Sequence, residues 1–141
     1  MQKIFLDTDV ILDVLAKRMP YYLHSAELLS EVEKNHIAAF TSPIVFANLY
    51  YILRKLKTKE YALQSLRKLR IIVQIVSVNE QHIDKALNSE FTDFEDAIQH
   101  YSAQTAQIDY LITRNVKDYK SGFISVCTPE AYLSILKSGT Q

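Results

Sequence analysis

The stretch KIFLDTD, residues 3–9, decides which class of fold to expect. Its apolar run is brief and stops abruptly at Asp7-Thr8-Asp9, which is typical of a short buried strand over residues 3–6 followed by a polar turn. Ligands of open parallel sheets collect beyond the carboxyl ends of the strands. Asp7 therefore falls where a binding site is expected, if the first strand belongs to such a sheet.

The rest of the chain alternates helical and strand patterns. Strands are predicted at residues 36–41, 71–78, 110–113 and 124–126. Helical patterns are predicted at residues 10–15, 22–34, 42–56 and 59–69, after Asn79, from about 96 to 105, and from Thr128-Pro129 onward. Strands that alternate with helices favour an α/β fold with a mostly parallel sheet and helices on both faces.

Two helix starts are marked by their side chains. Ser42 can cap a helix in which Pro43 occupies the first turn, where proline is tolerated. Thr92 and Glu95 have the spacing of a capping box, in which the hydroxyl and the carboxylate satisfy free amides at the start of a helix.

Bulk composition indicates one domain over residues 1–141. Apolar residues make up 48% of the chain, enough for a genuine core, and two Gly and three Pro leave little room for linkers. Cys127 is the only cysteine, so no internal disulfide can form and a reducing cytoplasm is expected. The apolar run before Asp7 is too short for a signal peptide, and no segment is long enough to span a membrane.

The formal net charge is zero, but the charges are segregated. Residues 54–70 hold seven basic side chains, including Arg54 and Lys55, against one acid. Residues 79–96 hold six acids against one lysine. The basic segment could follow a nucleic-acid backbone, although a charged helical hairpin is more often only a solvated surface.

Three acidic or polar clusters are candidates for chemistry. Asp7 and Asp9 could hold Mg²⁺ or Mn²⁺ through carboxylate oxygens, or Asp7 could simply cap the next helix. Asp93 and Asp96 share a face of a helix, with Glu95 turned away, although acids in a first turn also interact favourably with the helix dipole. The third cluster, Thr113-Arg114-Asn115 with Asp118 beyond it, could complete a site or form an ordinary polar loop.

Taken in order, the motifs FLDTDVILD (residues 5–13), DFEDAIQ (93–99) and YLITRNVKDY (110–119) resemble those of PIN-domain nucleases. The segment FANLYYILRK (46–55) resembles the bacterial branch of that family. The resemblance implies a three-layer α/β/α sandwich, an acidic Mg²⁺ or Mn²⁺ site, and hydrolysis of phosphodiester bonds, usually in RNA. The resemblance further implies that the protein is the toxin of a toxin–antitoxin pair. An antitoxin protein would then be its partner, and a homodimer is the expected assembly.

The residues of this chain match the family's functional positions unequally well. Asp7 matches the first acidic position and Asp96 the central one, and either Asn115 or Asp118 would serve at the last. Many family members carry Glu on the helix after the second strand, where this chain has Asn48. Because an amide is a neutral and weaker ligand, either Asp93 or Asp9 compensates or the activity is reduced.

The resemblance also suggests a role for each candidate. Asp7 and Asp96 would ligate the cation, Asp93 and Asn115 would bind it through water or tune it, and Asp118 is a further metal candidate. Thr8 and Thr113 would orient carboxylates or contact the substrate. Substrate contacts are also assigned to Arg114, Arg54 and Lys55.

Two other functions compete with a metal nuclease. With Asn48 as its clue, a PIN-like module could bind RNA or protein without cutting. The opening motif also resembles the nucleophile motif of haloacid-dehalogenase-type phosphatases, in which Asp7 would become a phosphoaspartate. That family requires an acidic pair after a late strand, whereas the sequence DFED lies at a helix start here, and the chain is short for that fold.

Overall fold

A five-stranded, wholly parallel sheet forms the centre of the computed structural model, which describes residues 1–139. Its strands lie in the order β3-β2-β1-β4-β5. Their bounds are Lys3–Leu6 (β1), Ala38–Thr41 (β2), Val73–Ile75 (β3), Tyr110–Ile112 (β4) and Ser125–Cys127 (β5).

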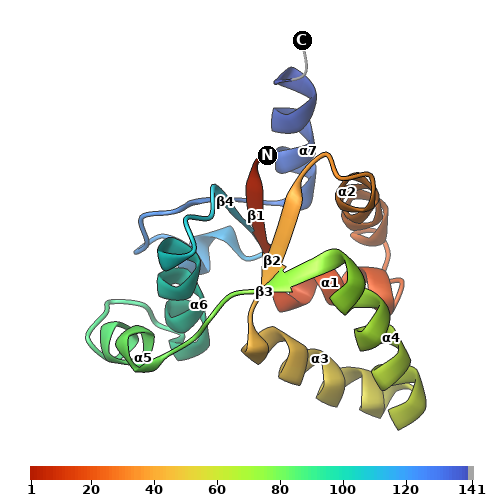
Figure 1. Cartoon of the computed structure of the whole chain (residues 1–141), viewed down its shortest axis with the longest axis horizontal. Coiled ribbons are helices and arrows are strands. Elements are labelled where there is room, and N and C mark those ends of the chain that lie inside the picture. Colours follow the sequence, from red (N-terminus) through yellow and green to blue (C-terminus); the bar gives the residue numbers. More distant parts are fainter. Residues whose placement is uncertain (140–141) are drawn as a thin grey trace.

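Helices cover both faces of this sheet (Figure 1). Helices α5 (Glu80–Leu87) and α6 (Phe94–Thr105) pack together on one side, whereas α1 to α4 lie on the other. These four helices span Thr8–Leu15, Tyr22–Glu33, Pro43–Leu56 and Lys59–Ile72. The last helix, α7 (Pro129–Ser138), packs against α2, and a 3-10 turn, η1 (Val116–Tyr119), precedes β5. The expected three-layer α/β/α sandwich is confirmed.

Strand β1 lies at the centre of the sheet and of the core. Ile4, Phe5 and Leu6 are fully buried, because β1 pairs with β2 on one edge and with β4 on the other while helices cover both faces. The chain runs from β1 to β2 and β3 in one direction and then crosses to β4 on the opposite side of β1. This change of direction makes the carboxyl end of β1 the topological switch point, where open sheets bind their ligands.

Backbone and side-chain hydrogen bonds hold the strand ends together at the switch point. The Asp7 amide donates to the Ile112 carbonyl at 3.0 Å, and the Thr41 hydroxyl donates to the Leu6 carbonyl at 2.9 Å. The side chains that follow β1, β2 and β4 therefore start from neighbouring points on one rim of the sheet.

The sequence was misleading about three boundaries. The strand expected at residues 71–78 shrinks to β3, because α4 continues through Ile71 and Ile72 and the Arg70 guanidinium caps its end by donating to the Val73 carbonyl at 3.0 Å. The strand expected from His36 begins only at Ala38, since Asn35 turns the chain with a φ of 62°.

The third correction concerns the start of α6. Asp93, rather than Thr92, is the N-cap, and its carboxylate accepts from the Asp96 amide at 2.9 Å. Glu95 is therefore not a capping partner and is free to make another contact. In the described part of the chain, no helix has the length and apolar composition to cross a membrane.

Candidate functional site

A polar cleft with a volume of about 340 Å³ opens beside the carboxyl end of β1. Six acidic side chains line it, together with one arginine and several amides. The acids are Asp7, Asp9, Asp93, Glu95, Asp96 and Asp118. The remaining residues are Thr8, Leu12, Arg18, Asn48, Ile52, Gln99 and Asn115. The structure thus brings together nearly all the carboxylates that the sequence singled out.

Asp7 is held by neighbours from three parts of the chain. One carboxylate oxygen accepts from the Thr8 amide at 2.8 Å and from the Gln99 side chain at 3.1 Å. The other accepts from the Thr113 hydroxyl at 3.0 Å and from the Tyr119 hydroxyl at 3.1 Å. Asp7 is also the N-cap of α1, so its capping role and its place in the cleft coexist.

Tyr119 joins Asp7 to Asp96. Its hydroxyl lies 3.1 Å from Asp7 Oδ2 and 3.1 Å from Asp96 Oδ1, and it accepts from the Gln99 amide. Burial, reinforced by the two carboxylates, raises the pKa of this phenol, so it stays protonated. One hydroxyl hydrogen can serve only one carboxylate fully. A proton on the other carboxyl group would complete the second hydrogen bond.

Asp96 is the carboxyl group best placed to carry that proton. Burial raises its pKa to about 7, and the negative charges of Asp7 and Asp93 add to the shift. A carboxylate in a partly desolvated site beside like charges favours protonation, and a nearby cation would reverse this preference.

Asp9 shows the same tendency and has an unused oxygen. Burial, followed by repulsion from Asp7, raises the Asp9 pKa to about 6. Its Oδ2 accepts from the Arg114 backbone amide at 3.1 Å and from the Asn115 side chain at 3.2 Å. Its Oδ1 is buried and has no hydrogen-bond partner. Buried polar atoms are rarely left unpaired without a functional or structural reason.

The donor set of this cleft fits a hard divalent cation, which prefers oxygen ligands. A cation would neutralise the crowded carboxylates and offer a partner to Asp9 Oδ1. Within residues 1–139, no three His, Cys, Asp or Glu side chains form a ready-made metal cage. The oxygens of Asp7 accept hydrogen bonds from Thr113, Tyr119 and Gln99 instead.

Asn48, which stands where the family that the sequence resembles often carries Glu, contacts an acid that sequence reasoning had set aside. Its side-chain amide donates to Glu95 Oε1 at 3.1 Å, and both residues line the cleft. Glu95 was expected to turn away from Asp93 and Asp96, yet it lines the same cleft as both of them. A carboxylate is therefore present beside Asn48.

The other predicted residues occupy three different settings. Asn115, Asp118 and Thr8 line the cleft. Thr113 is buried, and its hydroxyl donates a hydrogen bond to Asp7. Arg54 and Lys55 are exposed in the last turn of α3 and do not line the cleft.

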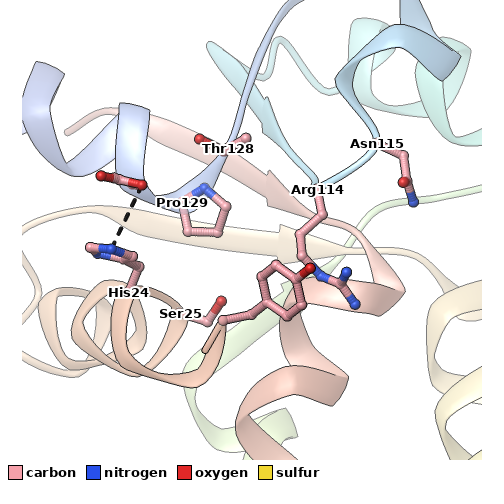
Figure 2. Close-up of a pocket in the computed structure, with 8 residues that line it drawn as sticks. His24, Ser25, Arg114, Asn115, Thr128 and Pro129 are labelled. Carbon is pink, nitrogen blue, oxygen red and sulfur yellow. Dashed lines mark ion pairs between the residues drawn. The ribbon is translucent and has the colours of Figure 1, made fainter. Parts of the chain in front are cut away.

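Arg114 does not line the acidic cleft but lines a neighbouring cavity (Figure 2). Its guanidinium binds the fully buried Asp13 at 2.8 Å and stacks over the Tyr21 ring at 3.9 Å. Asp13 also binds Arg18 at 2.9 Å, and this second arginine does line the acidic cleft. Asp13 thus positions one arginine at each of two adjacent cavities.

Sequence reasoning missed Gln99, Tyr119, Arg18 and Asp13, although all but Arg18 lie inside the motifs that it quoted. Gln99 ends DFEDAIQ and Tyr119 ends YLITRNVKDY. A helical spacing of three places Gln99 on the same face as Asp96, which could have indicated it. Nothing local indicates that Tyr119 reaches Asp7, a residue 112 positions away.

Comparison with known proteins places this geometry in context. A model of the PIN domain matches residues 3–117. Ribonuclease VapC1 from Aquifex aeolicus (strain VF5) is 27% identical over 136 residues, which cover 93% of each chain.

Solved structures share the fold at lower sequence identity. VapC20 of Mycobacterium tuberculosis, described as a Sarcin-Ricin loop cleaving toxin, aligns with a TM-score of 0.68 at 16% identity, over 87% of this chain and 98% of that one. VapBC-1 from nontypeable Haemophilus influenzae aligns with a TM-score of 0.68 at 20% identity, over 92% and 99% of the two chains.

Proposed function

This chain belongs to the PIN domain family, and we propose on that basis that it is a divalent-metal-dependent endoribonuclease that hydrolyses RNA phosphodiester bonds in the acidic cleft. The observation that carries the proposal is the pairing of Asp7 with Asp96 around the Tyr119 hydroxyl. Carboxyl groups that are half-buried and crowded enough to raise the pKa of Asp96 to about 7 are poised to bind a cation.

Asp7 and Asp96 would hold the cation, which we take to be Mg²⁺ or Mn²⁺, with Asp93 and Asn115 acting through water and Asp118 as a further ligand. When bound, the cation would neutralise charge at the scissile phosphate and lower the pKa of the attacking water. Glu95, held beside Asn48 at 3.1 Å, is the best-placed carboxylate to replace the glutamate that many relatives carry. Asp9 would offer its unpaired Oδ1 to the same cation.

Neutral side chains would keep the carboxylates in position. Thr113 and Gln99 each hold one oxygen of Asp7, and Tyr119 spans Asp7 and Asp96. Hydrogen bonds of this kind fix the orientation of a ligating carboxylate and tune its basicity. Arg18, the one cation lining the cleft among the described residues, would face the phosphate.

The substrate would leave the cleft along α3. Asn48 and Ile52 line the cleft, and Arg54 and Lys55 follow on the exposed last turn of the same helix. Their charges would contact the RNA backbone, so binding should weaken as salt rises. Thr8 would contact the substrate within the cleft and Arg114 would do so beside it.

The relatives suggest a biological setting for this activity. Several structural neighbours are toxin–antitoxin complexes, including one from Klebsiella pneumoniae that aligns at 23% identity with a TM-score of 0.68. We propose that the present chain is also a toxin of this kind. It would act in the cytoplasm, form a homodimer and be bound by an antitoxin protein. Asn48 favours a second candidate, a PIN-like module that binds RNA or protein without cutting it.

A comparison of substrates separates these functions. Purified protein would be incubated with mixed RNA, single-stranded DNA and a small aryl phosphate, each in Mg²⁺, in Mn²⁺ and in EDTA. Cleavage of RNA with either cation and not in EDTA supports the proposal. RNA that is bound but left intact supports the noncatalytic module. Release of phosphate from the aryl ester, with RNA left intact, would instead support phosphatase chemistry.

A further inference from the structure

A second cavity, with a volume of about 320 Å³, lies beside the acidic cleft (Figure 2). Residues of α2, the β4–η1 loop and the start of α7 line it. These residues are Tyr21, His24, Ser25, Arg114, Asn115, Thr128, Pro129 and Glu130. Asn115 lines both this cavity and the acidic cleft, so the two spaces adjoin at this residue.

Ser25 gives this cavity an unused polar group. The residue is fully buried, and its hydroxyl has no hydrogen-bond partner. In Figure 2 the hydroxyl points from α2 toward Pro129, into the space that the lining residues surround. A buried hydroxyl that lacks a partner costs free energy, which a ligand atom could recover by accepting or donating a hydrogen bond there.

The charges around the cavity do not favour an anion. Arg114 is already bound to the buried carboxylate of Asp13 at 2.8 Å. At the other end, Glu130 lies 3.7 Å from His24 and contributes a negative charge (Figure 2). Among the residues that line this cavity, a phosphate group would therefore find no arginine that is free of a carboxylate partner, and the Glu130 carboxylate would repel it.

The shape and chemistry of the walls favour a flat, neutral, polar ring. The Arg114 guanidinium lies 3.9 Å from the centroid of the Tyr21 ring, so two planar groups are already stacked at the edge of the cavity. The Pro129 ring and the Tyr21 ring provide apolar surface, whereas Ser25 and Asn115 provide a hydroxyl and an amide. Nucleic-acid bases stack on such rings and offer both donors and acceptors at their edges.

We propose that this cavity is a nucleobase subsite, which receives the base of a nucleotide next to the phosphodiester bond that is cut. The inference rests on the proposed ribonuclease function, because Asn115 joins this subsite to the acidic cleft. Ser25 reads the edge of the base, and the stacked pair of Tyr21 and Arg114 flanks its plane. The enzyme therefore prefers particular bases at one position beside the cleavage site.

The chain offers a matched pair of variants for the test. Ser25→Ala removes the unpaired hydroxyl from the cavity. Ser102→Ala removes another buried hydroxyl without a partner, on α6 and outside this cavity and the acidic cleft. Because neither hydroxyl is paired in the free protein, both variants should unfold at the same temperature as the parent or higher.

Binding is measured first, in EDTA, by titrating the isotope-labelled protein with AMP, CMP, GMP and UMP and following amide NMR shifts. At least one nucleotide should cause saturable shifts at Ser25 and Thr128. Ser25→Ala should weaken its binding by about three- to ten-fold, the effect of losing one hydrogen bond, and Ser102→Ala should not. The proposal is overturned if no nucleotide shifts these amides, or if Ser25→Ala binds as well as the parent.

Cleavage is measured separately by sequencing the ends that each protein produces from a random RNA pool. The parent and Ser102→Ala should share a base preference beside the cut, and Ser25→Ala should relax it. Cutting with an unchanged preference in Ser25→Ala would overturn the subsite and leave the ribonuclease function intact. Nucleotide binding at Ser25 without any RNA cleavage would contradict the ribonuclease function alone.

Discussion

At the scale of single residues, the Tyr119 hydroxyl shows how this site holds like charges together. It lies 3.1 Å from a carboxylate oxygen of both Asp7 and Asp96, and it is buried where water cannot replace it. Two carboxylates beside one shared donor repel each other, and protonation of one of them or a bound cation would relieve that repulsion. The site therefore combines a structural hydrogen bond with a demand for positive charge.

Replacing this hydroxyl tests its contribution to folding. Tyr119→Phe removes the donor that Asp7 and Asp96 share and leaves a buried Gln99 N–H without its acceptor, so we expect the free energy of unfolding in EDTA to fall by about 1–3 kcal/mol. Urea unfolding measures this change. Tyr101→Phe is the control, because the Tyr101 ring packs against the rings of Phe91 and His100 and does not line the cleft. An unchanged midpoint for Tyr119→Phe would show that the hydroxyl contributes nothing to stability.

The raised pKa of Asp96, about 7, makes a prediction about pH. In the unfolded chain this group ionises near its usual value of 3.8, so between that pH and 7 the folded state binds more protons. Its contribution to stability therefore falls as pH rises through this window. In EDTA, the melting temperature of Asp96→Asn should therefore increase relative to that of the parent as the pH is raised from 4 to 7.5. A constant difference would contradict the raised pKa.

Glu95 provides a residue-scale test of how the chain manages without a glutamate at position 48. Glu95→Gln keeps the size of the side chain and its contact with Asn48 but removes a negative charge from the cleft. We expect the Mn²⁺ concentration for half-maximal RNA cleavage to rise about three- to ten-fold, because fewer charges attract the cation. Glu90→Gln, which does not line the cleft, should leave it unchanged. If both variants require the same Mn²⁺ concentration, then a residue other than Glu95 compensates for the missing glutamate at position 48.

At the scale of elements, the helix starts marked by both a capping hydroxyl and a proline were predicted correctly. Ser42-Pro43 and Thr128-Pro129 begin α3 and α7 as expected, because an N-cap hydroxyl and a proline in the first turn act within a few residues. Ile71 and Ile72 were expected in a strand, since β-branched residues favour one. They end α4 instead, and the Arg70 contact to Val73 that closes this helix has no local signature.

The turn between η1 and β5 makes an element-scale prediction, because it packs closely on α6. A Cβ at Gly122 would lie 2.6 Å from Cε1 of the His100 ring, which is buried beside Phe91 and Tyr101 and has no room to shift. We expect Gly122→Ala to destabilise the fold by about 1–3 kcal/mol, as overpacking does. Gly139→Ala meets only ordinary contacts and is the control. Equal urea midpoints for the two variants would mean that the ring moves freely.

At the scale of the whole molecule, the strand order β3-β2-β1-β4-β5 assembles the site. Because β1 is central and the chain changes direction across it, Asp7 meets residues that follow β4 and begin α6. The sequence predicted this location, since strand ends and motif order can be seen locally. It did not predict the contacts of Asp7 with Gln99 and Tyr119, which join residues 92 and 112 positions apart.

The most direct test of the whole account is the rate at which one RNA is cleaved in saturating Mn²⁺ by two variants that carry the same substitution. Asp96→Asn removes a carboxylate from the cleft, whereas Asp84→Asn makes the same change on the exposed surface of α5. With both variants folded, Asp96→Asn should cut at least about 100-fold more slowly than the parent and Asp84→Asn at the parent's rate. Equal rates for Asp96→Asn and the parent, or cleavage that persists in EDTA, would contradict a metal-dependent ribonuclease in this cleft.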